Sequence, residues 1–212
     1  MIVVAFISQK GGVGKSTLAR ALAREAVASG LQVKIGDLDT DQATIIDWHK
    51  VRTQRDIEPA ISVELFRGIA EAIRAAERHD LLVIDGPAKA STNTTEIARQ
   101  SQLVVQPTGA ALDDLKPAVR VFHGLIKAGI RQDRLIFALN HIGTDNEADA
   151  ARAYIEEAGY AALPGYLPER PAYRIAQNEG YAITETRFAS LKGRADTLIQ
   201  ALIDRVGEGA NG

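Results

Sequence analysis

Residues 8–17, SQKGGVGKST, bring together small flexible residues, two lysines and two adjacent hydroxyl residues. A loop whose backbone N–H groups turn inward around anionic oxygens needs the conformational freedom of glycine. The glycines that supply it here are Gly11, Gly12 and Gly14. In such a loop Lys15 reaches the terminal phosphates of a nucleotide, Ser16 places its hydroxyl on Mg²⁺, and Thr17 adds contacts at the start of a helix. The spacing predicts a phosphate-binding loop, with a simple glycine turn as the alternative.

Acidic residues follow two of the expected strands. Asp85 comes directly after four apolar residues in LLVIDGP, where an acid holds a Mg²⁺-bound water while its strand stays buried. Asp37, Asp39 and Asp41 in KIGDLDTDQ are spaced by two, so they share one side of an extended chain. Three like charges so close need a cation among them. The sequence therefore predicts a magnesium nucleotide site, and a strand-end cap at Asp85 and a solvated turn at Asp41 are the alternatives.

The elements that position these groups alternate along the chain. Short runs that are apolar on both faces predict buried parallel strands at residues 2–7, 32–36, 62–66, 81–84, 103–106 and 135–140. Helical spacing predicts helices at residues 15–29, 43–53, 67–78, 93–100, 115–128, 147–158 and 189–206. The pattern indicates an α/β fold with a doubly wound, mostly parallel sheet flanked by helices. We expect one domain over residues 1–206 and a disordered tail over residues 207–212.

Composition narrows the classes of site that the chain can hold. The 212 residues include no cysteine, which excludes disulfides, thiolate metal sites and cysteine-ligated iron–sulfur clusters. The formal net charge of -2 means that any contact with nucleic acid must come from a local basic patch. No apolar run reaches membrane-spanning length, and the first residues have the pattern of a strand and not of a signal peptide. We also expect no DNA-binding domain before the first strand.

Three motifs together resemble the ParA/MinD superfamily of deviant Walker-type P-loop ATPases: KGGVGKST, DLD after the second strand, and VIDGP. Residues 165–185, GYLPERPAYRIAQNEGYAITE, look like the carboxyl-terminal region of small ParA-type partition proteins, and the likeness runs from residue 2 to about 206. The resemblance implies ATP and Mg²⁺ as cofactors. The ATP-binding residues that it implies are Lys10, Gly11, Gly12, Val13, Gly14, Lys15, Ser16, Thr17 and Pro168. Those implied for the metal are Ser16, Asp39 and Asp85.

The loop departs from the usual G-x-x-x-x-G-K-[ST] form, because Gln9 replaces its first glycine and Lys10 follows. Lys10 matches the signature lysine of the family, which reaches across an ATP-bound sandwich dimer to the phosphates of the partner subunit. The resemblance therefore implies a homodimer when ATP is bound. Asp37 matches the acid that positions the attacking water. The catalytic residues that the resemblance implies are Lys10, Lys15 and Asp37.

Two segments leave questions open. The family usually has a proline between its second acid and the glutamine, whereas Thr40 and Asp41 intervene here, so the roles of Asp39 and Asp41 stay open. Residues 163–171 match the family's base-recognition segment, with Pro168 at its centre, but a plain proline-rich loop is the alternative. The segment VIDGPAKAS offers no glutamine or histidine base, so we expect slow intrinsic hydrolysis.

The resemblance leaves three outputs to weigh. In ParA-type partition or positioning of plasmid, chromosome or protein cargo, the ATP dimer binds DNA nonspecifically and a ParB-like or cargo-adaptor protein stimulates hydrolysis; such a protein is cytoplasmic and nucleoid-associated. The weak local surplus of cations that would contact DNA comprises Arg170, Arg174, Arg187, Lys192 and Arg194. A solvated helix face is the alternative for these residues.

The second output is MinD-like positioning at a membrane, which needs a terminal amphipathic helix with a basic polar face. The last predicted helix carries an apolar stripe, Leu191, Ala195, Leu198, Leu202 and Val206, but few cations, so we expect the stripe to pack in the core and no membrane partner. The third output is a metabolic P-loop enzyme on the same scaffold, such as a biotin-pathway carboxylating ligase.

Overall fold

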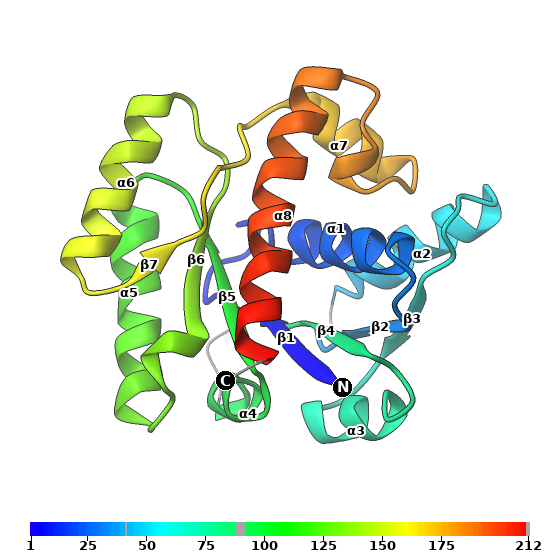
Figure 1. The fold of residues 1–212 in the computed structure, drawn as a ribbon, viewed down its shortest axis with the longest axis horizontal. Coiled ribbons are helices and arrows are strands. Elements are labelled where there is room, and N and C mark those ends of the chain that lie inside the picture. The colour runs from blue at the N-terminus through cyan, green and yellow to red at the C-terminus, as the bar shows by residue number, and fades with distance from the viewer. Residues whose placement is uncertain (41, 88–91, 211–212) are drawn as a thin grey trace.

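The computed structural model describes residues 1–40, 42–87 and 92–210, and these form one seven-stranded sheet with helices on both faces (Figure 1). The strands are β1 (Ile2–Phe6), β2 (Val33–Asp37), β3 (Ser62–Leu65), β4 (Leu81–Asp85), β5 (Leu103–Thr108), β6 (Leu135–Leu139) and β7 (Ala161–Ala162). Every strand pair is parallel, in the order β3-β2-β4-β1-β5-β6-β7. The predicted doubly wound α/β fold is confirmed.

Eight α-helices and two 3₁₀ turns are found among the described residues. The helices are α1 (Lys15–Ala28), α2 (Thr44–Gln54), α3 (Ile69–Ala75), α4 (Thr92–Gln100), α5 (Leu112–Lys127), α6 (Asp145–Glu157), α7 (Pro171–Asn178) and α8 (Ala189–Ala210). The 3₁₀ turns are η1 (Gln132–Arg134) and η2 (Ile183–Glu185). Over the described part of the chain, no helix combines the length and the hydropathy needed to span a bilayer.

Alternate side chains of each central strand enter two separate cores. Val3 and Ala5 of β1 pack with residues of α3, α4, α5 and α6, whereas Val4 and Phe6 pack with residues of α1, α2 and α8. In the view of Figure 1, α5 and α6 lie at the left, α3 and α4 at the bottom, and α1, α2 and α7 in the right half. Burial on both faces removes a large apolar area from water, which explains why the strands read as continuous apolar runs.

The strand order brings the expected functional segments to one edge of the sheet. The chain leaves β1 toward β2 and β4 on one side, and later places β5 on the other side of β1. Phe6 pairs in register with Asp85, and Asp37 pairs with Asp85 from the opposite side. Because parallel strands end at the same edge, the glycine loop after β1 and these two acids lie together at a topological switch point.

The last helix is longer than its apolar periodicity predicted. We expected a helix over residues 189–206, but α8 continues to Ala210. Val206 packs against the core, and Arg205 donates hydrogen bonds to the carbonyl of Asp133 and to Glu208 at 2.6 and 2.9 Å. These contacts hold the final turns, which the glycine-rich sequence alone did not suggest. Residues 211–212 lie outside the described residues.

The sequence did not predict helix α7: residues 163–171 match the family's base-recognition segment, with a plain proline-rich loop as the alternative. Pro171 occupies the first turn of α7, where a missing N–H costs nothing, and Gly180 follows the helix with φ of +86°. The pair of residues is a start and stop signal typical of a short helix. The preceding prolines obscured it.

Candidate nucleotide-binding site

The glycine loop adopts the backbone conformation that its sequence predicts. Gly12 and Gly14 have φ of +76° and +106°, a region that favours glycine. A Cβ at Gly14 would lie 2.0 Å from Nδ2 of Asn140. Asn140 follows β6 and donates a hydrogen bond from Nδ2 to the carbonyl of Val13 at 2.7 Å. The loop after β1 is therefore braced from the end of β6, and a side chain at position 14 would collide with Asn140 on a backbone of positive φ.

Behind the loop, α1 begins with the two residues that the motif requires. Lys15 is buried, and Ser16 donates a hydrogen bond from Oγ to Oδ2 of Asp85 at 2.5 Å. Asp85 is only 2% exposed, and its Oδ1 has no hydrogen-bond partner among the residues that the structure describes. Burial raises the pKa of Asp85 to about 7, against the opposing influence of the Ser16 hydrogen bond and the Lys15 charge.

This arrangement fits a magnesium nucleotide. A buried carboxylate oxygen without a partner costs free energy unless a ligand or water satisfies it. The described residues contain no cluster of three acidic or histidine side chains, so an ion here would take further oxygen ligands from phosphate and water, as Mg²⁺ commonly does. Ser16 and Asp85 are the residues that would hold the ion and its bound water. When bound, Mg²⁺ would neutralise charge on the phosphates.

The other predicted acids lie in the turn that follows β2. Asp37 is fully buried and accepts hydrogen bonds from the backbone N–H groups of Asp39 and Ile45 at 2.9 and 3.3 Å. Burial raises its pKa, and those two hydrogen bonds oppose the shift. Asp39 accepts from the backbone N–H of Gln42 at 3.2 Å and, among the described residues, makes no hydrogen bond with Ser16 or Asp85. Asp41 and residues 88–91 of the VIDGPAKAS segment lie outside the described residues.

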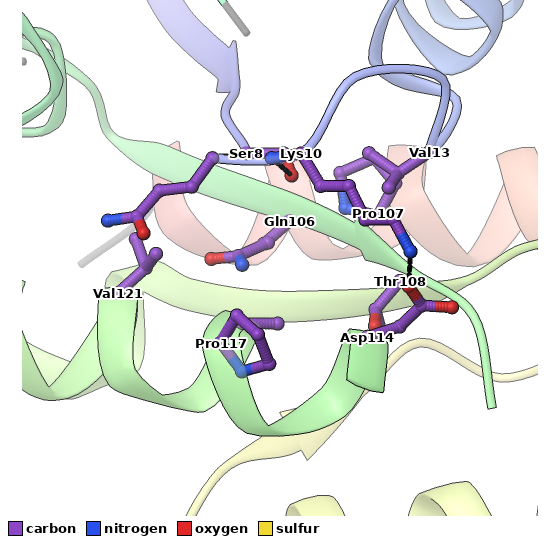
Figure 2. Close-up of a pocket in the computed structure, with 11 residues that line it drawn as sticks. Ser8, Lys10, Val13, Gln106, Pro107, Thr108, Asp114, Pro117 and Val121 are labelled. Atoms are coloured by element: carbon purple, nitrogen blue, oxygen red, sulfur yellow. Dashed lines mark hydrogen bonds and ion pairs between the residues drawn. The ribbon is translucent and has the colours of Figure 1, made fainter. Parts of the chain in front are cut away.

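Lys10 lies on a different side of the loop from Lys15. Its ammonium forms an ion pair with Asp114 in the first turn of α5, and its side chain is 59% exposed (Figure 2). The hydrogen bond and charge of Asp114 raise the pKa of Lys10. The helix starts three residues earlier than we expected, because Asp113 and Asp114 favour its N-terminus. That earlier start brings Asp114 to the loop.

A pocket of about 270 Å³ lies between the loop, the end of β5 and α5. Figure 2 shows Gln106 among the side chains that line it, with the ion pair of Lys10 and Asp114 to one side. Gln106 is buried, and within the described part of the chain its Oε1 has no hydrogen-bond partner. Pro107, Pro117 and Val121 supply apolar walls. The side of the loop that carries Lys10 therefore faces a pocket.

The segment expected to recognise a base runs along β6. Leu167 donates a backbone hydrogen bond to Leu139 at 3.0 Å, and Pro168 forms an isolated parallel bridge with Ile142. His141, the residue before Ile142, lies with its Nε2 3.1 Å from the carbonyl of Gly12. Pro168 is buried. It is linked to the phosphate loop through its bridge partner Ile142 and the preceding residue, His141, which contacts Gly12.

Sequence reasoning missed three residues that shape this site: Asn140, Asp114 and Arg20. Asn140 was visible only as a polar residue at the end of an apolar run, and Asp114 lay outside the expected helix. Arg20 had no motif at all. It is buried in α1, and burial lowers its pKa to about 10, although the charges of Asp85 and Asp37 oppose the shift. Its signal was a charged residue on an apolar helix face.

The cations expected to contact DNA occupy α7 and the chain around the start of α8. Arg170 is the N-cap of α7, and Arg174 on that helix is exposed and 3.5 Å from Glu169. Lys192 and Arg194 pair with Asp196 and Asp145. The guanidinium of Arg187 lies 5.2 Å from the centroid of the Phe188 ring. Three of the five cations are therefore partly neutralised by acids.

The apolar stripe of α8 packs inside the protein. Ala195, Leu198 and Leu202 are fully buried, and Leu191 and Val206 pack against the same core. These side chains are therefore occupied by intramolecular contacts.

Comparison with known proteins agrees with this geometry. The family model of the CobQ/CobB/MinD/ParA nucleotide binding domain matches residues 4–183. The maintenance of carboxysome distribution protein A of Gloeobacter kilaueensis is 26% identical over 186 residues, which cover 87% of this chain and 85% of that protein.

Two solved structures share the fold. The septum site-determining protein MinD of Pyrococcus horikoshii, complexed with Mg-ADP, has a TM-score of 0.76 at 18% identity and covers 100% of this chain and 99% of its own. The apo McdA of Cyanothece has a TM-score of 0.74 at 17% identity, with 95% of this chain and 99% of its own covered. The match of the family model covers most of the chain, and it includes the loop, both strand-end acids and the Pro168 segment. We conclude that the chain belongs to the CobQ/CobB/MinD/ParA nucleotide-binding domain family.

Proposed function

We propose that this chain is a ParA-type positioning ATPase that uses ATP and Mg²⁺. ATP binding drives the formation of a sandwich homodimer, the dimer binds DNA nonspecifically, and slow hydrolysis is stimulated by a ParB-like or cargo-adaptor protein. The protein acts in the cytoplasm, associated with the nucleoid. The cargo is a plasmid, a chromosome or a protein assembly, and the relative named for carboxysome distribution favours the last.

The observation that carries this proposal is the position of Lys10. Lys15 is buried behind the loop, where it serves the phosphates of its own subunit. Lys10 is exposed beside a hollow surface, held by one ion pair with Asp114. An exposed ion pair is weak, so a stronger anion can replace Asp114 at little cost. The phosphates of a second subunit are such an anion, and their charge would be offset by Lys10 during hydrolysis.

Within each subunit, the described residues suit a positioning mechanism. The N-terminus of α1 and the loop N–H groups orient the phosphates, and Ser16 and Asp85 hold the metal. Asp37 lies one strand away from Asp85, with both oxygens already accepting backbone hydrogen bonds. Asp37 would therefore orient the attacking water more readily than it would remove a proton from that water. Slow intrinsic turnover follows from this lack of a strong base.

Light scattering with and without ATP tests the dimer. The wild-type protein should double in mass with Mg-ATP and remain monomeric with Mg-ADP. Lys10→Ala should bind ATP as a monomer but fail to dimerise, because its own phosphate cradle is intact. Dimerisation of Lys10→Ala at wild-type ATP concentrations contradicts the proposed role of Lys10.

Sedimentation with duplex DNA or with liposomes tests the output. We expect ATP-dependent sedimentation with DNA and none with liposomes, since the apolar stripe of α8 is buried. Binding to liposomes instead supports the MinD-like alternative. Absence of both argues for a metabolic enzyme or a switch that acts only on proteins.

A further inference from the structure

Helix α7 has one side toward the phosphate loop and the other toward solvent. On the inner side, Oε1 of Gln177 accepts hydrogen bonds from Oγ1 of Thr17 at 3.0 Å and from Nη1 of Arg20 at 3.1 Å. On the outer side, Arg174 is 62% exposed, and Ile175 next to it is 51% exposed. One helix of eight residues therefore touches α1 and also carries part of the proposed DNA surface.

Arg20 extends this contact to α2. Its Nη2 donates to the carbonyl of Thr44 at 2.6 Å, and its guanidinium lies 5.3 Å from the centroid of the Trp48 ring. Nε1 of Trp48 in turn donates to the carbonyl of Tyr181 at 3.1 Å, just beyond α7. The Thr17–Gln177–Arg20 cluster is thus in contact with α1, α2, α7 and the turn after α7.

We propose that Gln177 is a positioning residue that transmits occupancy of the phosphate loop to α7 and so sets the affinity of the α7 surface for DNA. This inference rests on the proposed function, which identifies the two ligands as ATP and DNA. Thr17 follows Ser16 at the N-terminus of α1, where the motif predicts phosphate. A hydroxyl has one hydrogen to donate, and a bond to an anionic phosphate oxygen is stronger than a bond to a neutral amide. Bound phosphate therefore takes the Thr17 hydroxyl away from Gln177.

The loss matters because Gln177 makes the side-chain hydrogen bonds that join α7 to α1 among the described residues. Tyr173 donates from its hydroxyl to the carbonyl of Leu191 at 2.6 Å, and Ala176 is buried in the core. Gln177 supplies the contact with the nucleotide-binding helix. When only Arg20 remains as its donor, Gln177 can follow Arg20, and the helix can tilt about Tyr173 and Ala176. One net hydrogen bond corresponds to a change in DNA affinity of roughly twofold to tenfold.

The protein contains its own spectroscopic reporter of this change. Trp48 is the sole tryptophan of the chain, and it contacts both Arg20 and the turn after α7. We compare three proteins: the wild type, Gln177→Ala, and Asn178→Ala as the matched control, because Asn178 is the exposed neighbour on the same helix. Binding of radiolabelled ATP is measured separately by equilibrium dialysis, so fluorescence is compared at equal occupancy.

We expect saturating Mg-ATP to change Trp48 emission in the wild type and in Asn178→Ala. Gln177→Ala should bind ATP within about twofold of the wild type but lose at least half of the emission change. Arg20, which lies against Trp48, would keep its hydrogen bond to the carbonyl of Thr44 and lose the one to Gln177. Gln177→Glu keeps the acceptor oxygen and should restore the response, which a merely packing role would not require. The ratio of DNA affinities in ATP and ADP should fall about twofold to tenfold in Gln177→Ala alone.

Two results overturn the relay: no emission change in ATP-loaded wild type, or a wild-type change in Gln177→Ala. If Gln177→Ala is poorly folded by circular dichroism, amide hydrogen exchange decides. Mg-ATP should then alter protection of α7 in the wild type, and unaltered protection overturns the relay. A wild type that shows the emission change but never binds DNA contradicts the DNA part of the proposed function and leaves the relay supported.

Discussion

The two sides of the glycine loop place a lysine in opposite surroundings. Behind the loop, Lys15 is buried next to the Ser16–Asp85 hydrogen bond, and Asp85 retains a buried oxygen that no described residue satisfies. In front of it, Lys10 is exposed and paired with Asp114 beside a pocket. The buried side is preorganised for one ligand, because rearrangement there would leave charges unpaired in a medium of low polarity. The exposed side can exchange partners, since water compensates each group when it separates.

The difference suggests a division of work in the family loop. A lysine that binds the phosphates of its own subunit needs a fixed position, and burial supplies it. A lysine that acts on another subunit needs to be held loosely until that subunit arrives. Substitutions at Lys15, Asp85, Gly14 and Asp114 should remove or weaken this contrast, with the largest effect at Lys15.

Lys15→Ala should remove the buried cation and reduce ATP affinity by roughly 30-fold or more, because loss of one partner from a buried charge pair costs several kcal/mol. Equilibrium dialysis with radiolabelled ATP measures it. Lys10→Ala is the matched control and should retain monomer binding. Equal losses in the two variants would erase the contrast between the sides of the loop.

Asp85→Asn tests the buried side through pH. The pKa of Asp85 is raised from 3.8 to about 7, so its neutral form stabilises the nucleotide-free fold below about pH 4. That contribution disappears as the pH rises through about 7. Urea unfolding at pH 5 and pH 8 should show a fall in stability of up to a few kcal/mol for the wild type and a smaller fall for Asp85→Asn.

Nucleotide affinity should change with pH in the direction opposite to stability, because it depends on the ionised form of Asp85. Mg²⁺ prefers an ionised carboxylate, so Mg²⁺-dependent nucleotide affinity should rise in the wild type as the pH increases through about 7. Asp85→Asn should lack that rise in a titration followed by calorimetry. A wild-type affinity independent of pH between 6 and 8 would argue against Asp85 as a metal-binding residue.

Gly14→Ala should destabilise the protein by about 1–3 kcal/mol, because the new Cβ would collide with Asn140 and the backbone has positive φ. Urea unfolding without nucleotide measures the change. Gly11→Ala is the control: a Cβ there meets nothing within 4 Å, so we expect a change within about 0.5 kcal/mol. Similar stabilities would mean that the Asn140 brace is not rigid.

Asp114→Asn should free Lys10 and lower the ATP concentration needed for dimerisation by about twofold to fivefold, the range typical of an exposed ion pair. Light scattering during an ATP titration measures it, and the effect should shrink at high salt. Asp113→Asn is the control. It removes an equal charge from the same helix turn, but Asp113 acts on Lys10 through its charge, whereas Asp114 also accepts a hydrogen bond from Lys10. Weaker dimerisation of Asp114→Asn would show that Asp114 helps Lys10 in the dimer.

Periodicity predicted most of the secondary structure because its signals are local. The six apolar runs became six strands, and every expected helix was found, with ends that moved by a few residues. The two-residue β7 has no period to detect, and Pro168 with its neighbours hid the start of α7. The start of α5 moved because two acids favour a helix N-terminus, an effect that an apolar pattern does not register.

By itself the sequence determined the phosphate loop, the strand-end acids and the family, because a loop that wraps phosphate has few solutions in residue type and spacing. It also indicated that the loop carries two lysines with different tasks. Only the tertiary structure decided which side chains contact the loop and the start of α1: Asn140 contacts Gly14, Asp114 contacts Lys10, and Gln177 contacts Thr17. These contacts join residues from 104 to 160 positions apart, and their partners are chosen by the order of strands in the sheet. No local pattern encodes that order, since it arises from the packing of the whole chain.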